Sequence, residues 1–343
     1  MKKRLCVSGA LTAATLSGLM MVGPVFAEDL SEWVLPPVPV PKENPQNEAK
    51  IALGHRLAFD VRLSKNNSIS CAGCHLPFAG GGGHTPRAFG HGGELGRWAP
   101  SWVNAAFYTS QFWDGRAASL EEQTGALPGH GGPISAAGEM GNDVEGAVKR
   151  VAADPSYRKA FKAAFNDDVS RENIAKAIAS YERTLIATDA PFQHYAKGDE
   201  WAISSAAKRG FELFRGKAMC VTCHAPPLTT DNLFHNIGVP QVGPLKEDLG
   251  RYEVTKRASD KRAFKTPSLY NSASFSFFMH DGALSTMKEV IEHYNKGGDP
   301  TDPNQDLLMR PLKLSDQEIS DLVIFMKTLT DDRLNHVAAP EME

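Results

Sequence analysis

The sequence predicts a mainly α-helical protein of two domains with long loops. The chain has 343 residues, which suits two domains of about 100–200 residues each. Apolar residues recur at helical spacing in several segments, whereas alternating strand patterns are few. The pattern C-x-x-C-H occurs twice, with its first cysteines at residues 71 and 220. Because these positions lie 149 residues apart, each domain would carry one copy.

The composition narrows the class of protein. Hydrophobic residues make up 42% and charged residues 22% of the chain, which is typical of globular proteins and excludes a disordered or fibrous one. The net charge of −3 argues against a nucleic-acid binder, which would normally carry a basic patch. Five cysteines are too few for a disulfide scaffold, so their spacing calls for another chemical explanation.

The first 27 residues have the features of a secretory signal peptide. Residues 2–4 are Lys-Lys-Arg, an uncharged stretch follows, and Val25 and Ala27 place small residues before Glu28. This pattern predicts cleavage after Ala27 and a periplasmic mature protein. The alternative is a membrane anchor, which is less favoured because Gly, Ser and Thr interrupt the apolar run. No later stretch is long and apolar enough to span a bilayer.

The two C-x-x-C-H motifs predict covalent attachment of two haem c groups. The first motif supplies Cys71, Cys74 and His75, and the second supplies Cys220, Cys223 and His224. In such motifs the two thiols bond to the haem and the histidine binds its iron. A zinc site would not need a histidine in the fifth position each time. A redox-active dithiol explains the repeated histidine equally poorly.

The remaining elements follow from apolar spacing and capping residues. Ser119, with Glu122 three residues later, and Ser315, with Glu318, are predicted helix starts. The predicted helices cover residues 47–58, a segment from 119, and residues 143–165, 171–187, 203–215, 286–296 and 315–329. The Pro-rich residues 28–47 are predicted to form an extended arm, and 79–101 and 226–285 to form loops. The predicted domains are residues 28–190 and residues 191–343.

Several further motifs resemble those of a known family. Residues 111–117 read Gln-Phe-Trp-Asp-Gly-Arg-Ala and residues 138–141 read Gly-Glu-Met-Gly. Three more motifs follow in the second half of the chain. They are Phe-Lys-Thr-Pro-Ser-Leu at 264–269, Met-His-Asp-Gly at 279–282 and Glu-His-Tyr-Asn at 292–295. In this order the motifs resemble the bacterial di-haem cytochrome c peroxidase/MauG family, from about residue 48 to residue 330. The resemblance implies an enzyme that acts on hydrogen peroxide. It also implies that the domain of residues 28–190 binds peroxide and that the domain of residues 191–343 transfers electrons.

The resemblance also implies roles for individual residues in the first half of the chain. Trp113 would relay electrons between the haems, and Gln123 and Glu139 would lie at the peroxide-binding haem. A carboxylate can shuttle the proton that peroxide must move between its oxygens, whereas an amide only orients or donates a hydrogen bond. The alternatives are that Trp113 is a core aromatic residue and that Glu139 is a solvated loop carboxylate.

The axial ligands on the far side of each haem are less well defined. The resemblance implies that His91 caps the first haem in its resting state, with His84 and His130 as competitors in similar Gly-rich contexts. Tyr294 stands where the peroxidases carry a Met ligand of the second haem and MauG-like proteins carry a Tyr. The alternative is that Tyr294 is a packing residue and that Met279 or Met287 is the ligand.

Three functions follow from these expectations. The first is a periplasmic peroxidase that receives electrons from a small c-type cytochrome or cupredoxin. The second is a MauG-like enzyme that uses peroxide to oxidise a Trp or Tyr of a partner protein, and the third is a non-catalytic electron carrier. The family's calcium ion between the domains is in question, because Trp98 stands where an Asn ligand is expected. The sequence leaves both a monomer and a homodimer open.

Overall fold

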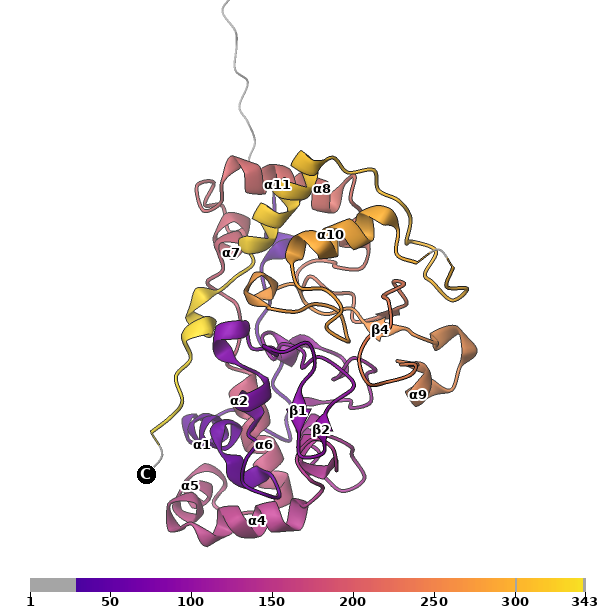
Figure 1. Ribbon diagram of the computed structural model, residues 1–343. Coiled ribbons are helices and arrows are strands. Elements are labelled where there is room, and N and C mark those ends of the chain that lie inside the picture. The colour runs from indigo at the N-terminus through magenta and orange to yellow at the C-terminus, as the bar shows by residue number, and fades with distance from the viewer. Residues whose placement is uncertain (1–28, 300, 342–343) are drawn as a thin grey trace, which may run out of the picture.

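The computed structural model describes residues 29–299 and 301–341, and the mainly helical prediction is confirmed (Figure 1). The α-helices are α1 (Glu48–Phe59), α2 (Cys71–Cys74), α3 (Leu120–Gln123), α4 (Val144–Ala153), α5 (Pro155–Phe165), α6 (Arg171–Glu182), α7 (Pro191–Ala196), α8 (Ser205–Arg215), α9 (Tyr252–Thr255), α10 (Met287–Lys296) and α11 (Asp316–Lys327). The strands are β1 (Phe89–Gly90), β2 (Gly93–Glu94), β3 (Phe234–His235) and β4 (Phe264–Lys265). The signal-peptide prediction concerns residues 1–27, which lie outside the described residues. Within the described chain, no helix is long and apolar enough to cross a membrane.

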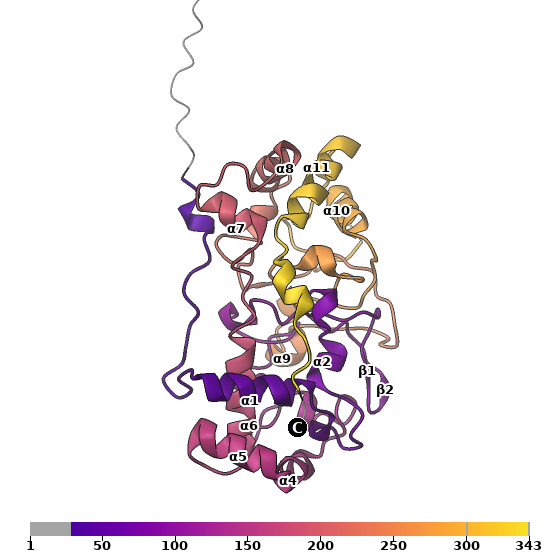
Figure 2. The ribbon, with the colours of Figure 1, turned by 90° about the vertical axis from the view of Figure 1, so that its left-hand side faces the viewer.

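Most of the longer helices form two groups at opposite ends of the molecule (Figures 1 and 2). The N-terminal helix group consists of α1, α4, α5 and α6, and the C-terminal helix group consists of α7, α8, α10 and α11. Loops fill much of the region between the two groups (Figure 1). The first C-x-x-C-H motif begins in α2, and the second lies in the turn that follows α8. The final residues run back along the molecule to α1, where His55 Nε2 lies 3.0 Å from the Ala338 carbonyl oxygen.

The N-terminal helix group is built around the contact of α1 with α6. Helix α1 begins at Asn47, whose side chain accepts a hydrogen bond from the Lys50 backbone N–H and so satisfies one free donor of the first turn. Gly54 allows the close approach, since a Cβ atom there would collide with the Ala177 carbonyl oxygen. Apolar side chains such as Leu57 and Ile178 are buried at this contact.

Two predicted helices have different limits in the structure. The segment 143–165 divides into α4 and α5 at Asp154. The cause is Pro155, which has no backbone N–H and is favoured in the first turn of a new helix. The helix predicted over 171–187 ends at Glu182, so Leu185 lies beyond it and packs in a different apolar cluster.

The C-terminal helix group is held together by aromatic side chains. Phe211 of α8 and Phe325 of α11 lie 5.4 Å apart between ring centroids. Trp33 of the N-terminal arm inserts among them, 5.0 Å from Phe211, with 2% of its surface exposed. The arm therefore crosses to the C-terminal helix group before the chain reaches α1. The predicted capping box that starts α11 is confirmed, with Ser315 and Glu318 bonding each other's backbone N–H.

Both predicted loops contain short ordered elements. Residues 79–101 include the hairpin β1–β2, so the prediction of a loop over this whole segment is wrong at the hairpin. In the loop 226–285, strand β3 pairs antiparallel with β4, with Phe234 opposite Lys265. This pairing joins the segment after the second motif to the Phe-Lys-Thr-Pro segment and forms part of a wall of the site described next.

Candidate haem sites

Each C-x-x-C-H motif lies in a short helical turn at the edge of a cavity. The first lies in α2, where Ser70 caps the turn by accepting a hydrogen bond from the Gly73 backbone N–H, and the second forms a 3-10 turn over Cys220–Thr222. All four cysteines are free thiols. Burial raises the pKa of Cys71 and of Cys220 to about 12. In each motif both thiols are unpaired and line the cavity, as covalent attachment of haem requires.

The two histidines of the motifs are oriented in the same way. His75 Nδ1 lies 2.8 Å from the Pro100 carbonyl oxygen, and His224 Nδ1 lies 2.9 Å from that of Thr229. A carbonyl only accepts, so Nδ1 carries the proton and Nε2 keeps its lone pair for a metal. Burial lowers the pKa of both imidazoles, which keeps them neutral, as iron ligation requires. The residues of both motifs therefore fit a haem iron.

The cavity beside His75, here called the first cavity, has a volume of about 520 Å³ and contains both predicted peroxide-handling residues. Gln123 and Glu139 line it together with Cys71, Cys74 and His75. Gln123 Oε1 is buried with no hydrogen-bond partner among the described residues. This free acceptor is available to a ligand in the cavity.

Glu139 is a partly desolvated carboxylate. Burial raises its pKa, and the opposing attraction of Arg116 is weaker. Arg116 Nη2 lies 3.6 Å from Glu139 Oε1, which is an ion pair without close contact. A carboxylate whose pKa is raised toward the working pH can both accept and return a proton, so the alternative of a fully solvated loop carboxylate does not describe it.

His91 lies apart from the first cavity. It stands at the β1–β2 hairpin, is exposed, and is not among the described residues that line the cavity. Its backbone N–H donates to the Glu139 carbonyl oxygen at 2.8 Å. The competitors lie elsewhere, with His84 Nδ1 2.8 Å from Ser276 Oγ and His130 Nδ1 3.4 Å from Glu122. In this conformation none of the three caps the position opposite His75.

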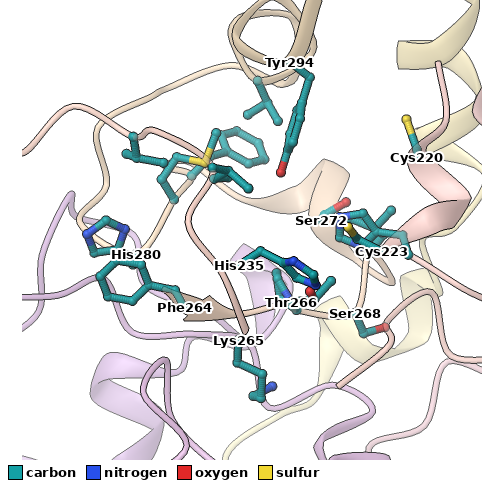
Figure 3. Close-up of a pocket in the computed structure, with 18 of the residues that line it drawn as sticks. Cys220, Cys223, His235, Phe264, Lys265, Thr266, Ser268, Ser272, His280 and Tyr294 are labelled. Atoms are coloured by element: carbon teal, nitrogen blue, oxygen red, sulfur yellow. The ribbon is translucent and has the colours of Figure 1, made fainter. Parts of the chain in front are cut away.

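The cavity beside His224, here called the second cavity, contains all three ligand candidates. Tyr294 and Met279 line it, and so does Met287. Tyr294 points from α10 into the cavity with its hydroxyl at the cavity end (Figure 3). Burial raises the pKa of the Tyr294 phenol, so it would ionise only if a cation such as ferric iron bound its oxygen. The structure thus brings all three candidates to the cavity.

Trp113 lies in the wall that divides the cavities. The residues that line both cavities are Trp98, Pro100, Ser101, Gln111, Phe112 and Trp113, here called the dividing wall. Trp113 has 9% of its surface exposed, and its Nε1–H donates to the Trp98 carbonyl oxygen at 3.0 Å. Its position between the cavities is the one an electron relay requires.

Comparison with known proteins agrees with this arrangement. The family model of the di-haem cytochrome c peroxidases matches residues 48–201. The chain is 41% identical to the methylamine utilization protein MauG of Methylorubrum extorquens over 295 residues, which cover 85% of this chain and 81% of that protein. The chain belongs to the di-haem cytochrome c peroxidase/MauG family. Family membership implies haem cofactors and makes the protein an oxidoreductase acting on peroxide.

Other relatives come from both branches of the family. The chain is 38% identical to the cytochrome-c peroxidase IdrP1 of a Pseudomonas species, with 86% of this chain and 84% of that protein covered. It also superposes on the crystal structure of a MauG-like protein associated with microbial copper homeostasis, with a TM-score of 0.81 and 31% identity. That match covers 89% of this chain and 95% of the other.

Several residues of these di-haem sites were missed from the sequence. Lys265 is buried beside the second cavity with Nζ 3.2 Å from the Tyr108 ring centroid, and burial lowers its pKa to about 7. His280 lines the same cavity, and its buried Nε2 has no partner within residues 29–299 and 301–341. Burial also raises the pKa of Glu182, in the first cavity, to about 8. The sequence contained a signal for two of these residues, because Lys265 belongs to the Phe-Lys-Thr-Pro motif and His280 to the Met-His-Asp-Gly motif.

The side chain of Trp98 cannot act as the calcium ligand that is expected at its position between the domains. Its indole is 3% exposed and lies in the dividing wall, and an indole offers no oxygen ligand. The adjacent Arg97 bonds Asp248 through two nitrogens, at 2.7 Å each, and Asp114 at 2.7 Å. At this point a guanidinium links the two acidic side chains from separate segments.

Proposed function

We propose that the protein is a periplasmic di-haem c peroxidase with one covalent haem in each cavity. Cys71 and Cys74 would attach the first haem and Cys220 and Cys223 the second. When bound, the haems supply a peroxide-binding iron and a store for single electrons. The observation that carries the proposal is that Gln123 and Glu139 line only the cavity of the first motif, while Trp113 lies between the two cavities.

Glu139 would move the proton in the first cavity. Reduction of hydrogen peroxide to two waters takes two electrons and two protons, and one proton must pass from the inner to the outer oxygen. Glu139 accepts that proton as a carboxylate and returns it as an acid. Gln123 cannot titrate, so its free oxygen orients peroxide by accepting a hydrogen bond. His75 and His224 hold the two irons through Nε2.

Electrons would enter at the second cavity and pass through Trp113. The donor class is a small c-type cytochrome or cupredoxin, since each delivers one electron at a time. The division of the chain into residues 28–190 and 191–343 belongs to this proposal, with peroxide chemistry in the first part and electron entry in the second. Export through residues 1–27 would place the protein where such donors occur.

His91 would act as a removable cap on the first haem. Because its ring lies outside the cavity, capping requires the β1–β2 hairpin to move. The hairpin is held by two backbone hydrogen bonds, from His91 N–H to Glu139 at 2.8 Å and from Gly92 N–H to Gly138 at 3.0 Å. Movement of the hairpin would therefore shift the segment that carries Glu139.

A second candidate function is favoured by Tyr294. A thioether such as that of Met279 stabilises ferrous iron, whereas an anionic phenolate stabilises the more oxidised states, and axial ligands shift haem potentials over roughly 0.8 V. A Tyr294 phenolate would suit a MauG-like enzyme, which uses peroxide to oxidise a Trp or Tyr of a partner protein. A protein partner is common to both functions, as a donor in one and as a substrate in the other.

A steady-state assay with reduced cytochrome c and peroxide separates the two functions. Fast oxidation of the cytochrome supports the peroxidase. Near-zero turnover, together with an oxidised state that persists after peroxide addition, supports the MauG-like enzyme. A protein that binds both haems and leaves peroxide unchanged is an electron carrier, and both proposals are then wrong.

A further inference from the structure

The dividing wall contains a second tryptophan that the family resemblance does not assign to electron transfer. Trp98 lines both cavities, as Trp113 does. The two ring centroids lie 6.5 Å apart with an interplanar angle of 52°. Of the side chains in the wall, only these two indoles lose an electron readily. Two oxidisable rings therefore lie next to each other between the proposed haem positions.

The surrounding chain fixes the Trp98 indole in place. Its Nε1–H donates to the Gly83 carbonyl oxygen at 3.0 Å, and its backbone N–H donates to the His280 carbonyl oxygen at 2.8 Å. The run of glycines in the preceding loop makes room for the ring, since a Cβ at Gly82 would lie 2.6 Å from it. Phe275 packs at 4.9 Å between centroids. A rigid, hydrogen-bonded ring changes little in geometry when it gains or loses an electron.

The charged groups next to Trp98 do not oppose its one-electron oxidation. Asp114 and Asp248 are both buried, and together they pair with the guanidinium of the adjacent Arg97. Arg116 also pairs with Asp114 at 3.1 Å, so the cluster contains as many carboxylates as guanidinium groups. The positive charge of Arg97 is thus compensated, and it does not oppose a transient positive charge on the indole.

We propose that Trp98 is a second electron-relay residue, acting in series with Trp113. In each step the Trp98 indole loses one electron to the oxidised Trp113 indole, which returns to its neutral form. The Nε1 proton stays on Trp98, because the Gly83 carbonyl accepts a hydrogen bond but is too weak a base to take the proton. An electron that enters through the second cavity then restores Trp98. The inference rests on the proposed function, because it requires a haem in each cavity and peroxide as the two-electron oxidant.

The test compares Trp98→Phe with the matched variant Trp33→Phe in the holoprotein. Trp33 is also buried, but it lines neither cavity among the residues that the structure describes. After one-electron reduction of the second haem, stopped-flow absorption follows transfer to the first. We expect Trp98→Phe to slow this transfer by about tenfold, which corresponds to a barrier increase of about 1.4 kcal/mol. Trp33→Phe should transfer at the wild-type rate.

A second readout does not depend on turnover. In protein frozen after addition of peroxide without a donor, electron paramagnetic resonance should detect an indole radical, identified by ring-deuterated tryptophan, with a lower yield in Trp98→Phe. If that variant loses a haem, a ring-fluorinated tryptophan at position 98 keeps the shape and the Nε1 hydrogen bond but is harder to oxidise. The same slowing of transfer is then expected.

Wild-type transfer rate and radical yield in either modified protein, with both haems bound, would overturn the relay role of Trp98. That outcome leaves the proposed function intact, since wild-type protein would still reduce peroxide. Failure of the wild-type protein to bind two haems or to react with peroxide would instead refute the proposed function.

Discussion

The first and second cavities share one way of presenting a histidine but differ in what surrounds it. In both, a C-x-x-C-H turn places the imidazole so that Nδ1 pairs with a backbone carbonyl, Pro100 in one and Thr229 in the other. The first cavity adds an amide and a carboxylate, Gln123 and Glu139. The second adds Tyr294 and methionines instead. The repeated motif would therefore hold two similar irons. In the function that we propose, the loops that close each cavity determine that protons are transferred at the first iron and that electrons enter at the second.

The largest effect is expected from Glu139→Gln. This substitution removes the only group in the first cavity to which we assign a proton transfer. General acid–base groups typically contribute about 10²–10⁴-fold, so the rate of peroxide consumption should fall by about that factor with both haems still bound. Stopped-flow absorption after mixing with peroxide measures it. Glu94→Gln is the matched control, because Glu94 lies on β2 and pairs with Arg87 at 2.7 Å. An unchanged rate in Glu139→Gln would mean that another group moves the proton.

The next effect concerns access to the first cavity. If His91 caps the resting haem, His91→Gly should leave an open coordination position in the fully oxidised protein, which would then react with peroxide without prior reduction. Electron paramagnetic resonance of the ferric protein reports the change in coordination. His130→Gly, in a similar Gly-rich segment, should behave as wild type. A wild-type ferric protein that already shows an open first haem would contradict the cap.

Tyr294→Met tests the character of the second cavity. Replacing an anionic phenolate by a thioether should raise the midpoint potential of the second haem, within the range of roughly 0.8 V that axial ligands span. It should also shorten the lifetime of the oxidised state that peroxide produces. A potentiometric titration measures the potential, with Met279→Leu as the control that should leave it unchanged. Equal potentials in wild type and Tyr294→Met, with a shift in Met279→Leu, would make Met279 the ligand.

The smallest effect is a shift in pH dependence at the first cavity. Glu139 acts as a base only when deprotonated, so the rate of peroxide consumption is full above its pKa and falls as the pH drops through it. Burial has already raised that pKa, while Arg116 and Arg97 lower it and Asp114 raises it. Arg116→Gln removes the strongest lowering influence, so the acidic limb should move to higher pH. Arg171→Gln, whose partner is Glu145 at 2.7 Å, should leave the profile in place.

The local features of this fold were predictable from the sequence. Capping residues such as Asn47 and Ser315 define helix starts because their side chains bond the free N–H groups of the first turn. The C-x-x-C-H spacing predicts that the groups of each motif lie together, because all of them lie within one turn of chain. Even the division of a predicted helix at Pro155 follows from local chemistry, although the apolar spacing alone suggested one continuous helix.

Features that depend on contacts between distant segments were not predictable. The burial of Lys265 results from the pairing of β3 with β4 and from Tyr108 above its ammonium group, and no local pattern contains that information. The spacing of His91 from His75 does not specify which way its ring points. Trp98 gains its place in the dividing wall from the loop glycines and from the Met-His-Asp-Gly segment, which are far from each other in the chain.

The account depends most directly on one covalent haem in each cavity, and mass spectrometry of the mature protein tests this. The intact mass should exceed that of the polypeptide by two haem masses. After proteolysis, the peptide with Cys71 and Cys74 and the peptide with Cys220 and Cys223 should each carry one haem. A total of one haem or none, or two haems on a single peptide, would contradict the proposal that each cavity holds one covalent haem.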